Sequence, residues 1–439
     1  MITKFKKAFQ DADFKEILTK GFSFLLLKVG GTIVGYLFTL FITLKFGANI
    51  YGVVAFSFSI FMIVSVVGKL GLDTNILKFF SDNENDKDSG LFYKSVLKSF
   101  VFSSVLSLLI FSFRYELVFQ IFEVPKPQLL PYLPWVLAAI PLWSVNHISA
   151  GYLRAKKHTK SFAFFYNPAR FLFSLLILSI LYLITQDPII TVQAHFFAVL
   201  LSAICSFLLV SSQIKKKQKR SKVNSWSFMF SGIPMMFSSS ILILLGWMDT
   251  FVMGIYEDDS EIGIYNVSLK VATLASFSLE AINAILAPKI AKDYLTNNSK
   301  NYKRLISFST KLNFLISSFV IIAIILLKDI LLGMFGIEFL AGATILIVFC
   351  FGQLINSFSG SVGVILQMTG KQKIYQNIVL VALVINLMLT FALTPIYGGV
   401  GAAIATVISM AFWNLGGAIY LKLYLNITSY FNPFKRDTK

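Results

Sequence analysis

The sequence predicts an all-α integral membrane protein of about twelve transmembrane helices in two pseudo-symmetric lobes of about six helices each. Hydrophobic residues make up 56% of the chain and charged residues 14%, with a mean hydropathy of +0.75. Soluble domains carry roughly a quarter charged residues. Apolar runs recur along the chain, each near the roughly twenty residues that cross a bilayer as a helix. Clusters of basic residues follow every second run.

The apolar runs define the expected spans in chain order. Runs such as 189–210 and 374–393 are apolar on every face, so they lack the alternation of polar and apolar residues that barrel strands require. Two long runs, 262–288 and 339–369, are expected to tilt or to protrude from the bilayer. The expected spans are 22–44, 52–80, 91–113, 128–152, 162–185, 189–214, 227–255, 262–288, 305–327, 339–369, 374–394 and 399–425.

Basic residues are distributed unequally between the two sets of connections. One set, which includes both ends of the chain, holds most of the Lys and Arg residues, among them Lys69, Arg154 and the run KKKQKRSK at 215–222. The last turns of the second span, through Asp73 and Lys78, are assigned to water. By the positive-inside rule, this asymmetry places both termini in the cytoplasm, with the surplus charge facing the anionic lipids of the inner leaflet. The other set holds only Lys45, Arg114, Lys126 and Lys328.

The chain is expected to divide at its longest basic run. The segment GANIYGV (47–53), which opens the second span, is similar to DSEIGIY (259–265), which opens the eighth. Because an even number of spans separates them, the halves would be parallel repeats, and paired halves commonly form a transporter with a site between them. Chance similarity between apolar sequences is the alternative. The expected parts are a cytoplasmic amphipathic N-terminus (1–21), an N-terminal lobe (22–214), a basic cytoplasmic linker (215–226), a C-terminal lobe (227–425) and a cytoplasmic tail (426–439).

Several classes of protein are excluded by these patterns. The formal net charge of +18 is carried between apolar spans and not on one face of a folded domain, so no nucleic-acid partner is expected. The sequence holds no phosphate-binding loop, no cluster of metal ligands and no nucleophile beside a base. We therefore expect neither an enzyme nor an ATP-driven pump, and no metal or cofactor. Cys205 and Cys350 lie in apolar segments and are interpreted as packing residues.

Four basic residues inside the expected spans are candidates for a binding site: Lys28, Arg170, Lys270 and Lys311. A charge at the bilayer centre costs at least about 2.5 kcal/mol, so such side chains are expected to face the bundle interior or a wet cavity. One hypothesis is a cationic cavity that accepts an anionic head group. The alternative is that Lys28, Arg170 and Lys311 lie near an interface and extend toward water. Pro168, close to Arg170, can bend its helix.

Five further residues are candidates for lining this cavity or for ion coupling: Asn266, Thr273, Glu280, Asp249 and His147. Helical spacing places Asn266 and Thr273 on the face of Lys270, which favours the cavity for that lysine, with Glu280 near the same face. Asp249 lies close to the outer end of its span, so a solvated end residue is the alternative to an ion site. His147 and its neighbour Asn146 are candidates for a proton relay. The alternative is a hydrogen bond to a neighbouring helix.

Four segments are distinctive: LKFGANIYG (44–52), GLDTNILKF (71–79), the stretch from Asp249 to Ile290, and PIYGGVGAAIAT (395–406). Together they resemble the Wzx-type polysaccharide flippases of the multidrug/oligosaccharidyl-lipid/polysaccharide exporter superfamily. The resemblance runs over nearly the whole chain. It implies a two-lobed fold like that of the MATE multidrug exporters and the MurJ peptidoglycan-precursor flippases, and alternating access from the inside to the outside of a bacterial cytoplasmic (inner) membrane.

The same resemblance implies a function and partners. The substrate would be an oligosaccharide linked to undecaprenyl pyrophosphate, used for a surface polysaccharide such as lipopolysaccharide O-antigen or capsule. A polysaccharide polymerase and chain-length machinery would be partners. The related peptidoglycan-precursor flippases have a central cavity lined mainly by arginine, whereas three of the four candidates here are lysine. The alternative function is a cation-coupled multidrug exporter of the same superfamily, which would need an acidic cavity, whereas the mid-span charges here are mainly basic.

Overall fold

The computed structural model describes residues 12–214, 221, 223–296 and 298–432. In these residues helices alternate with turns, and no strand occurs among them. Eight of the described helices are long and apolar enough to cross a membrane, or up to ten if each of two bent helix pairs counts as one span. The all-α membrane fold is therefore confirmed, while the number twelve stays a prediction.

Two of the longest helices are each bent at a glycine. α2 (Ala12–Gly68) has a non-helical residue at Gly47, and α17 (Gln372–Leu425) has one at Gly398. Each is counted above as a single candidate span, although its length of 57 or 54 residues exceeds what two crossings of about twenty residues need. The bends lie between spans that the sequence separates, after 22–44 and after 374–394.

The chain forms two compact units, one comprising Leu26–Gly263 and the other comprising Ile264–Lys439 with the residues before Leu26. The basic linker expected at 215–226 belongs to the first unit, but residues 215–220 and 222 lie outside the described part of the chain. The first eleven residues of the expected amphipathic N-terminus and the end of the tail from 433 also lie outside it. The lobe boundaries predicted from the sequence therefore stay predictions.

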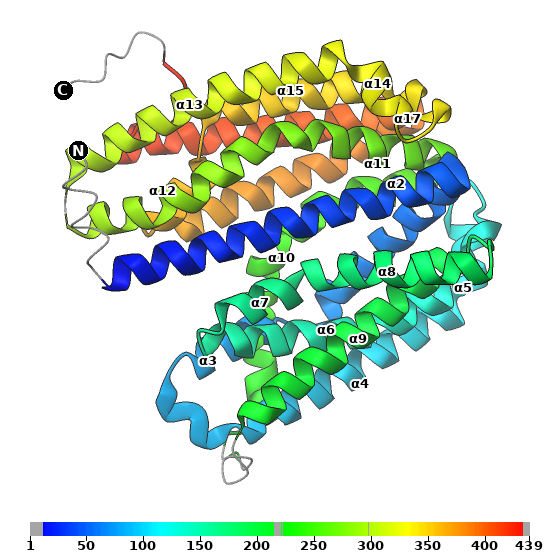
Figure 1. Ribbon diagram of the computed structural model, residues 1–439, viewed down its shortest axis with the longest axis horizontal. Helices are drawn as coiled ribbons and strands as arrows, with labels where there is room; N and C mark the ends of the chain where they lie inside the picture. The colour runs from blue at the N-terminus through cyan, green and yellow to red at the C-terminus, as the bar shows by residue number, and fades with distance from the viewer. Residues whose placement is uncertain (1–11, 215–220, 222, 297, 433–439) are drawn as a thin grey trace. The chain divides into compact units, whose positions relative to one another are not determined.

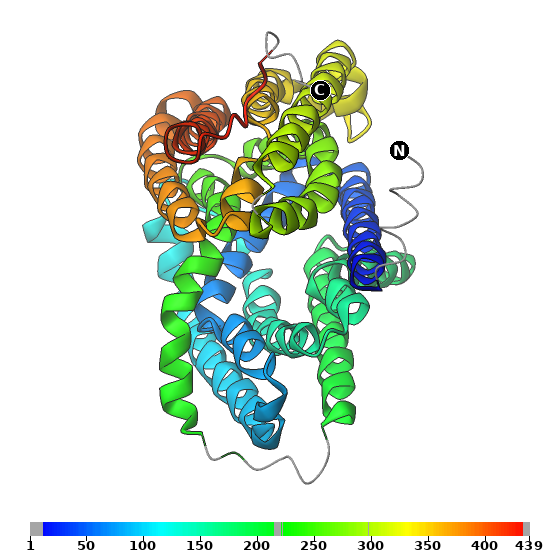
Figure 2. The same cartoon turned by 90° about the vertical axis from the view of Figure 1, so that its left-hand side faces the viewer.

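In the unit Leu26–Gly263, α6 lies at the centre, with α3, α4 and α9 packed against it (Figures 1 and 2). α7 and α8 meet at a bend of 52°, where Pro168 begins α8, as the sequence suggested. The elements after α2 are α3 (Leu72–Phe80), η1 (Asn83–Asp88), α4 (Gly90–Ser112), α5 (Arg114–Glu116), η2 (Leu117–Ile121), η3 (Pro127–Leu129), α6 (Leu133–Ala155), α7 (Thr159–Tyr166), α8 (Pro168–Ile184), α9 (Ile190–Gln213) and α10 (Ser225–Tyr256).

In the other unit, α13 packs against α15 and α15 against α17, so that these three long helices lie side by side (Figure 1). α12 packs against α13 and α16. The elements are α11 (Asp259–Thr273), which begins in the first unit, η5 (Leu274–Ser276), α12 (Phe277–Leu295), α13 (Ser299–Leu326), α14 (Lys328–Gly333), η6 (Ile337–Gly342), α15 (Ala343–Ser359), α16 (Val362–Met368) and α17.

The start of α11 contacts α2 just beyond its bend, so the two segments that look like repeats touch each other. A Cβ on Gly52 would lie 1.5 Å from the carbonyl oxygen of Asp259, and a Cβ on Gly263 would lie 2.3 Å from that of Ala48. Lys126, between η2 and η3, fixes the start of α11, because its Nζ lies 3.0 Å from Asp259 Oδ1 while its side chain is 1% exposed. The crossing itself is made by backbones in direct contact.

Gly52→Ala is expected to destabilise the protein, because the new methyl group would meet backbone and neither helix can yield locally. Overpacking of this kind costs typically about 1–3 kcal/mol, and we expect the upper end. The thermal midpoint of unfolding in detergent measures the effect. Gly30→Ala in the same helix is the matched control, since no atom lies within 4 Å of a Cβ there. Equal midpoints for the two variants would contradict the close crossing.

Candidate functional site

The site begins with the turn between α2 and α3. Leu70 and Gly71 both have left-handed backbone, with φ of 53° and 66°. At Gly71 the chain also touches α10, because a Cβ there would lie 2.2 Å from the carbonyl oxygen of Gly232. Glycine satisfies both requirements, since it adopts positive φ without cost and leaves room for the other backbone. The turn directs Lys69 into the protein, where it is 5% exposed.

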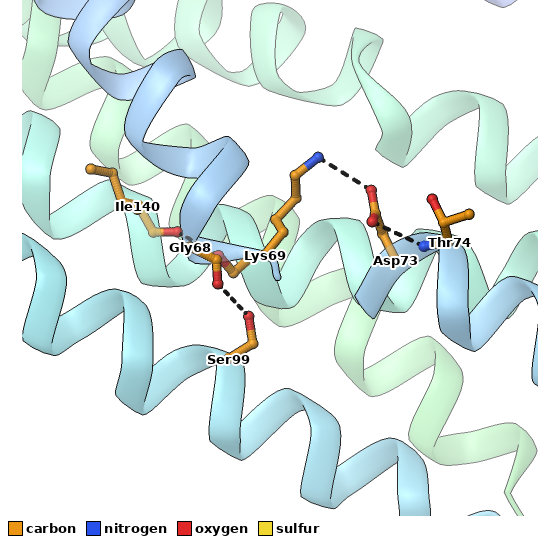
Figure 3. A network of polar contacts seen from close by, with 7 residues as sticks. Gly68, Lys69, Asp73, Thr74, Ser99 and Ile140 are labelled. Carbon is orange, nitrogen blue, oxygen red and sulfur yellow. Dashed lines mark hydrogen bonds and ion pairs between the residues drawn. The ribbon is translucent and has the colours of Figure 1, made fainter. Parts of the chain in front are cut away.

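Lys69 forms an ion pair with Asp73 across this turn (Figure 3). Its Nζ lies 3.2 Å from Asp73 Oδ2, with side-chain exposures of 6% and 16%. The N–H of Thr74 donates to Asp73 Oδ1 at 2.9 Å. The hydroxyl of Ser99 on α4 donates to the carbonyl of Gly68 at 2.9 Å (Figure 3). These bonds fix the end of α2 and orient the carboxylate. The pair is therefore a fixed, largely buried feature of the unit.

Two cavities lie beside the ion pair and share part of their walls. Their volumes are about 120 and 170 Å³, room for at least a few water molecules, since each occupies about 30 Å³ in the liquid. Lys69, His147 and Tyr166 line both cavities. Asp73 and Arg154 line the smaller one. The larger one is lined in addition by Met62, Ser65, Val66, Trp143, Asn167 and Ile243.

His147 lies on α6 with aromatic rings on two sides. Its ring centroid is 4.3 Å from that of Trp143 and 5.1 Å from that of Tyr166. The residue is 5% exposed, and neither ring nitrogen has a hydrogen-bond partner in the described part of the chain. A buried polar group without a partner is uncommon. His147 therefore has unused hydrogen-bonding capacity at the cavity wall.

Asn146, the other half of the suggested relay, instead ties three helices together. Its amide donates to the carbonyl of Phe165 on α7 at 2.8 Å, and its side-chain oxygen accepts from the Ser202 hydroxyl on α9 at 3.0 Å. The interhelical bonding that the sequence left as an alternative therefore applies to Asn146. It fixes the turn of α6 that carries His147.

Arg170 lies on the first turn of α8 and is 3% exposed. Its guanidinium carbon lies 5.1 Å from the ring centroid of Trp143 and 4.4 Å from that of Phe171. Nη1 lies 3.6 Å from the sulfur of Met62, and Nε is buried without a partner. No carboxylate within ion-pairing distance of Arg170 occurs among the described residues. Because Trp143 and Met62 line the larger cavity, this charge lies directly behind its wall.

The charges around the cavities are mainly positive. Lys69, Arg154 and Arg170 are opposed by Asp73, which already pairs with Lys69. Arg154 is exposed, with its guanidinium 5.1 Å from the ring of Phe162. Two cations are thus left without a paired carboxylate among the described residues. In a partly enclosed site, these cations attract an anion more strongly than the same charges would in bulk water.

The structure brings together only two of the residues singled out from the sequence, His147 and Arg170. Lys28 is exposed on α2 and Asp249 is buried on α10, and neither lines the two cavities. The remaining candidates belong to the other unit, and their part in a site stays a prediction. There, Asn266 is buried and Lys270, Thr273, Glu280 and Lys311 are half-buried, with the Thr273 hydroxyl donating to the Lys270 carbonyl at 2.7 Å.

Two predictions were wrong: Lys69 was counted in a cytoplasmic connection, and Asp73 was assigned to water at the end of the second span. Both line a cavity inside the unit, and only Lys78 beyond them is exposed. Their spacing was an available signal, because opposite charges at positions i and i+4 beside an apolar run can pair within one turn. Arg154 is exposed as expected for a loop cation, but it also lines the smaller cavity.

The apolar helices of the described residues define a multi-pass membrane protein, and solved structures with a similar fold include transporters and a flippase. The lipid II flippase MurJ in an inward closed conformation has a TM-score of 0.72 at 15% identity, covering 91% of this chain and 87% of that one. An inward-facing multidrug resistance MATE family transporter of the MOP superfamily has a TM-score of 0.68 at 14% identity, covering 90% and 94%. At these identities the likeness concerns the fold.

The chain belongs to the family of polysaccharide biosynthesis proteins, whose family model matches residues 17–293. The MatE family model matches residues 234–392. A probable low-salt glycan biosynthesis flippase of Haloferax volcanii is 26% identical over 182 residues, which are 41% of this chain and 39% of that protein. The chain thus spans about two fifths of the length of this curated relative. The relative and the two solved structures named here are flippases and a transporter.

Proposed function

We propose that this protein is a flippase that moves an oligosaccharide linked to a polyprenyl diphosphate from the inner to the outer leaflet of a bacterial cytoplasmic membrane. The observation that carries the proposal is the positive charge around the cavities of the unit Leu26–Gly263. Asp73 balances Lys69 there, so that the charges of Arg154 and Arg170 remain as a surplus of two. A diphosphate diester carries two negative charges, so its charge matches this surplus. Membership of the polysaccharide biosynthesis family and the name of the Haloferax relative support the choice of a glycan.

The membrane potential gives the proposed transport a direction. With both termini in the cytoplasm, as the basic connections predict, an anion that moves outward leaves a negative interior. This movement is favourable by roughly 2.3 kcal/mol per charge per 100 mV. Alternating access would then expose the cavity to each side in turn, while Lys69 and Arg154 offset the desolvation of the diphosphate. The oligosaccharide would pass to a polysaccharide polymerase and chain-length proteins on the outer side.

The other cations predicted from the sequence are proposed as further contacts for the head group or its sugars. They are Lys28 in the first unit and Lys270 and Lys311 in the second. Each is tested by alanine substitution, with surface polysaccharide measured in a host deleted for its own flippase. The basic connections on the cytoplasmic side are proposed to contact anionic lipids.

Arg154→Gln is expected to lower surface polysaccharide about tenfold, because one of the two surplus cations would be lost from the wall of a partly enclosed cavity, where charges interact more strongly than in bulk water. The measurement is polysaccharide in a host deleted for its own flippase, complemented with each variant at matched expression, after the wild-type chain has restored synthesis. Lys160→Gln is the matched control, since Lys160 is exposed nearby on α7 and does not line the cavities. Wild-type polysaccharide from Arg154→Gln would remove this residue from the site.

A cation-coupled multidrug exporter is the second candidate function, favoured by the MatE match to residues 234–392 and by the MATE fold. Organic cations need carboxylates in the site, and Asp249, which is 4% exposed on α10, is a buried carboxylate. The two functions are separated by expressing the chain in a drug-sensitive host. Drug resistance that is lost in Asp249→Asn would favour the exporter over the flippase.

A further inference from the structure

We infer that His147 is a proton-dependent part of the anion site: it takes up a proton when a diphosphate enters the cavity and then donates a hydrogen bond to it. This inference rests on the proposed function, since it concerns how the same cavity holds its substrate. His147 would thus bind the substrate in addition to the permanent cations Lys69, Arg154 and Arg170.

The first step is the unsatisfied state of the imidazole. A neutral histidine has one donor and one acceptor, and both are normally used when the ring is buried. The His147 ring is 5% exposed, and neither of its nitrogens has a partner in the described chain. It lines both cavities together with Lys69. A ligand in either cavity can therefore receive a hydrogen bond from His147 without breaking one that exists.

The second step is the set of charges that face the ring. The charged groups around it are Lys69 at the end of α2, Asp73 on α3, Arg154 farther along α6 itself and Arg170 on α8. Tyr166 on α7 is neutral, and α10 contributes the apolar Ile243. Because Asp73 already pairs with Lys69, a proton on His147 in the empty cavity would add a third positive charge to those of Arg154 and Arg170, which no carboxylate among the described residues offsets. That state is unfavourable in a medium of low dielectric.

A bound diphosphate diester lowers this cost, because its two negative charges offset those of Arg154 and Arg170 and can accept a hydrogen bond from the imidazolium. Binding of the anion and binding of the proton therefore favour each other, and the coupling is reciprocal. The site should hold its substrate more tightly as the pH falls, because binding is accompanied by uptake of a proton, which is more available at lower pH. Exchange of one proton sets the limit of this effect at a factor of ten per pH unit.

The chain supplies a matched control, because it contains three histidines. His195 is 2% exposed on α9, but its ring packs between Phe58 and Phe61, with centroids 4.4 and 5.0 Å away. It lines neither cavity. The third, His158, is exposed between α6 and α7. Replacing His195 therefore removes an equally buried imidazole without touching the cavity wall.

The experiment measures binding of a nucleoside diphosphate sugar to the purified full-length protein. This soluble diphosphate diester keeps its two charges between about pH 5.5 and 8, so that the histidine is the group that titrates. The wild type is expected to bind about tenfold more tightly at the acidic end, a typical size for coupling between two ligands. Calorimetry in buffers of different ionisation enthalpy should detect uptake of up to one proton. His147→Gln should lose the pH slope and the proton uptake, whereas His195→Gln should keep both.

The outcomes separate this inference from the proposed function. A pH slope and proton uptake retained in His147→Gln would overturn the inference, as would equal losses in His195→Gln. Failure of the wild type to bind the probe at any pH would also overturn it. The flippase proposal is judged separately by complementation, where Arg154→Gln serves as the charge test. In the binding assay, Arg154→Gln should weaken binding at every pH and leave the slope in place.

Discussion

Lys69→Ala is expected to abolish surface polysaccharide and to lower the stability of the protein at the same time. Removal of the ammonium leaves Asp73 as an unpaired carboxylate at the cavity wall, where it is fixed by the N–H of Thr74. Breaking a buried ion pair by removing one partner costs about 3–5 kcal/mol. The lone carboxylate would also repel a diphosphate. Thermal midpoints in detergent and polysaccharide in the flippase-deleted host measure the two losses.

The double variant Lys69→Ala/Asp73→Ala tells a structural pair from a substrate contact. Replacing both members of a buried pair by apolar groups is often close to neutral, so the double variant should regain most of the thermal stability. It should remain inactive, because the ammonium that offsets the desolvation of the diphosphate is still absent. Recovery of polysaccharide together with stability would mean that the pair only supports the turn between α2 and α3, and Lys69 would leave the proposed site.

The membrane fold could be predicted from the sequence because the bilayer imposes a simple rule on length and hydrophobicity. Each apolar run of sufficient length predicts a helix, whatever segments pack against it. Arg170 and His147 were found for the same reason, since a polar side chain inside such a run is conspicuous. Pro168 marked the bend between α7 and α8, because proline cannot donate the helical hydrogen bond.

The burial of Lys69 could not be predicted in this way, because it depends on contacts distant in the sequence. The turn at Leu70 and Gly71 is held against α10 by the close approach of Gly232. Asn75 on α3 reinforces this contact by donating to the carbonyl of Phe228 at 2.7 Å, across 153 residues of sequence. A hydropathy profile shows only that the apolar run has ended, so the charges that follow are assigned to water. Tertiary packing decides that they line a cavity instead.

Arg170→Met is expected to abolish transport without lowering the thermal midpoint. Burial of a charge costs several kcal/mol even after relaxation, and no carboxylate pairs with this guanidinium among the described residues. The rings of Trp143 and Phe171 offset part of this cost, with about 2 kcal/mol expected for a desolvated cation–π contact. Methionine removes the charge, still fills much of the space and can contact the same rings. Stability should therefore hold or rise by about 1 kcal/mol while the anion site loses a cation.

This combination of effects distinguishes a functional charge from an ordinary core residue. A core side chain that served packing alone would lose stability on substitution and would lose transport only in proportion. Arg170→Lys is the comparison variant, because it keeps the charge but loses the planar group that stacks on the rings. It should retain part of the polysaccharide at matched expression. Full transport by Arg170→Met would show that the charge behind the wall of Trp143 and Met62 takes no part in binding. A lower midpoint for that variant would show that the guanidinium stabilises the fold.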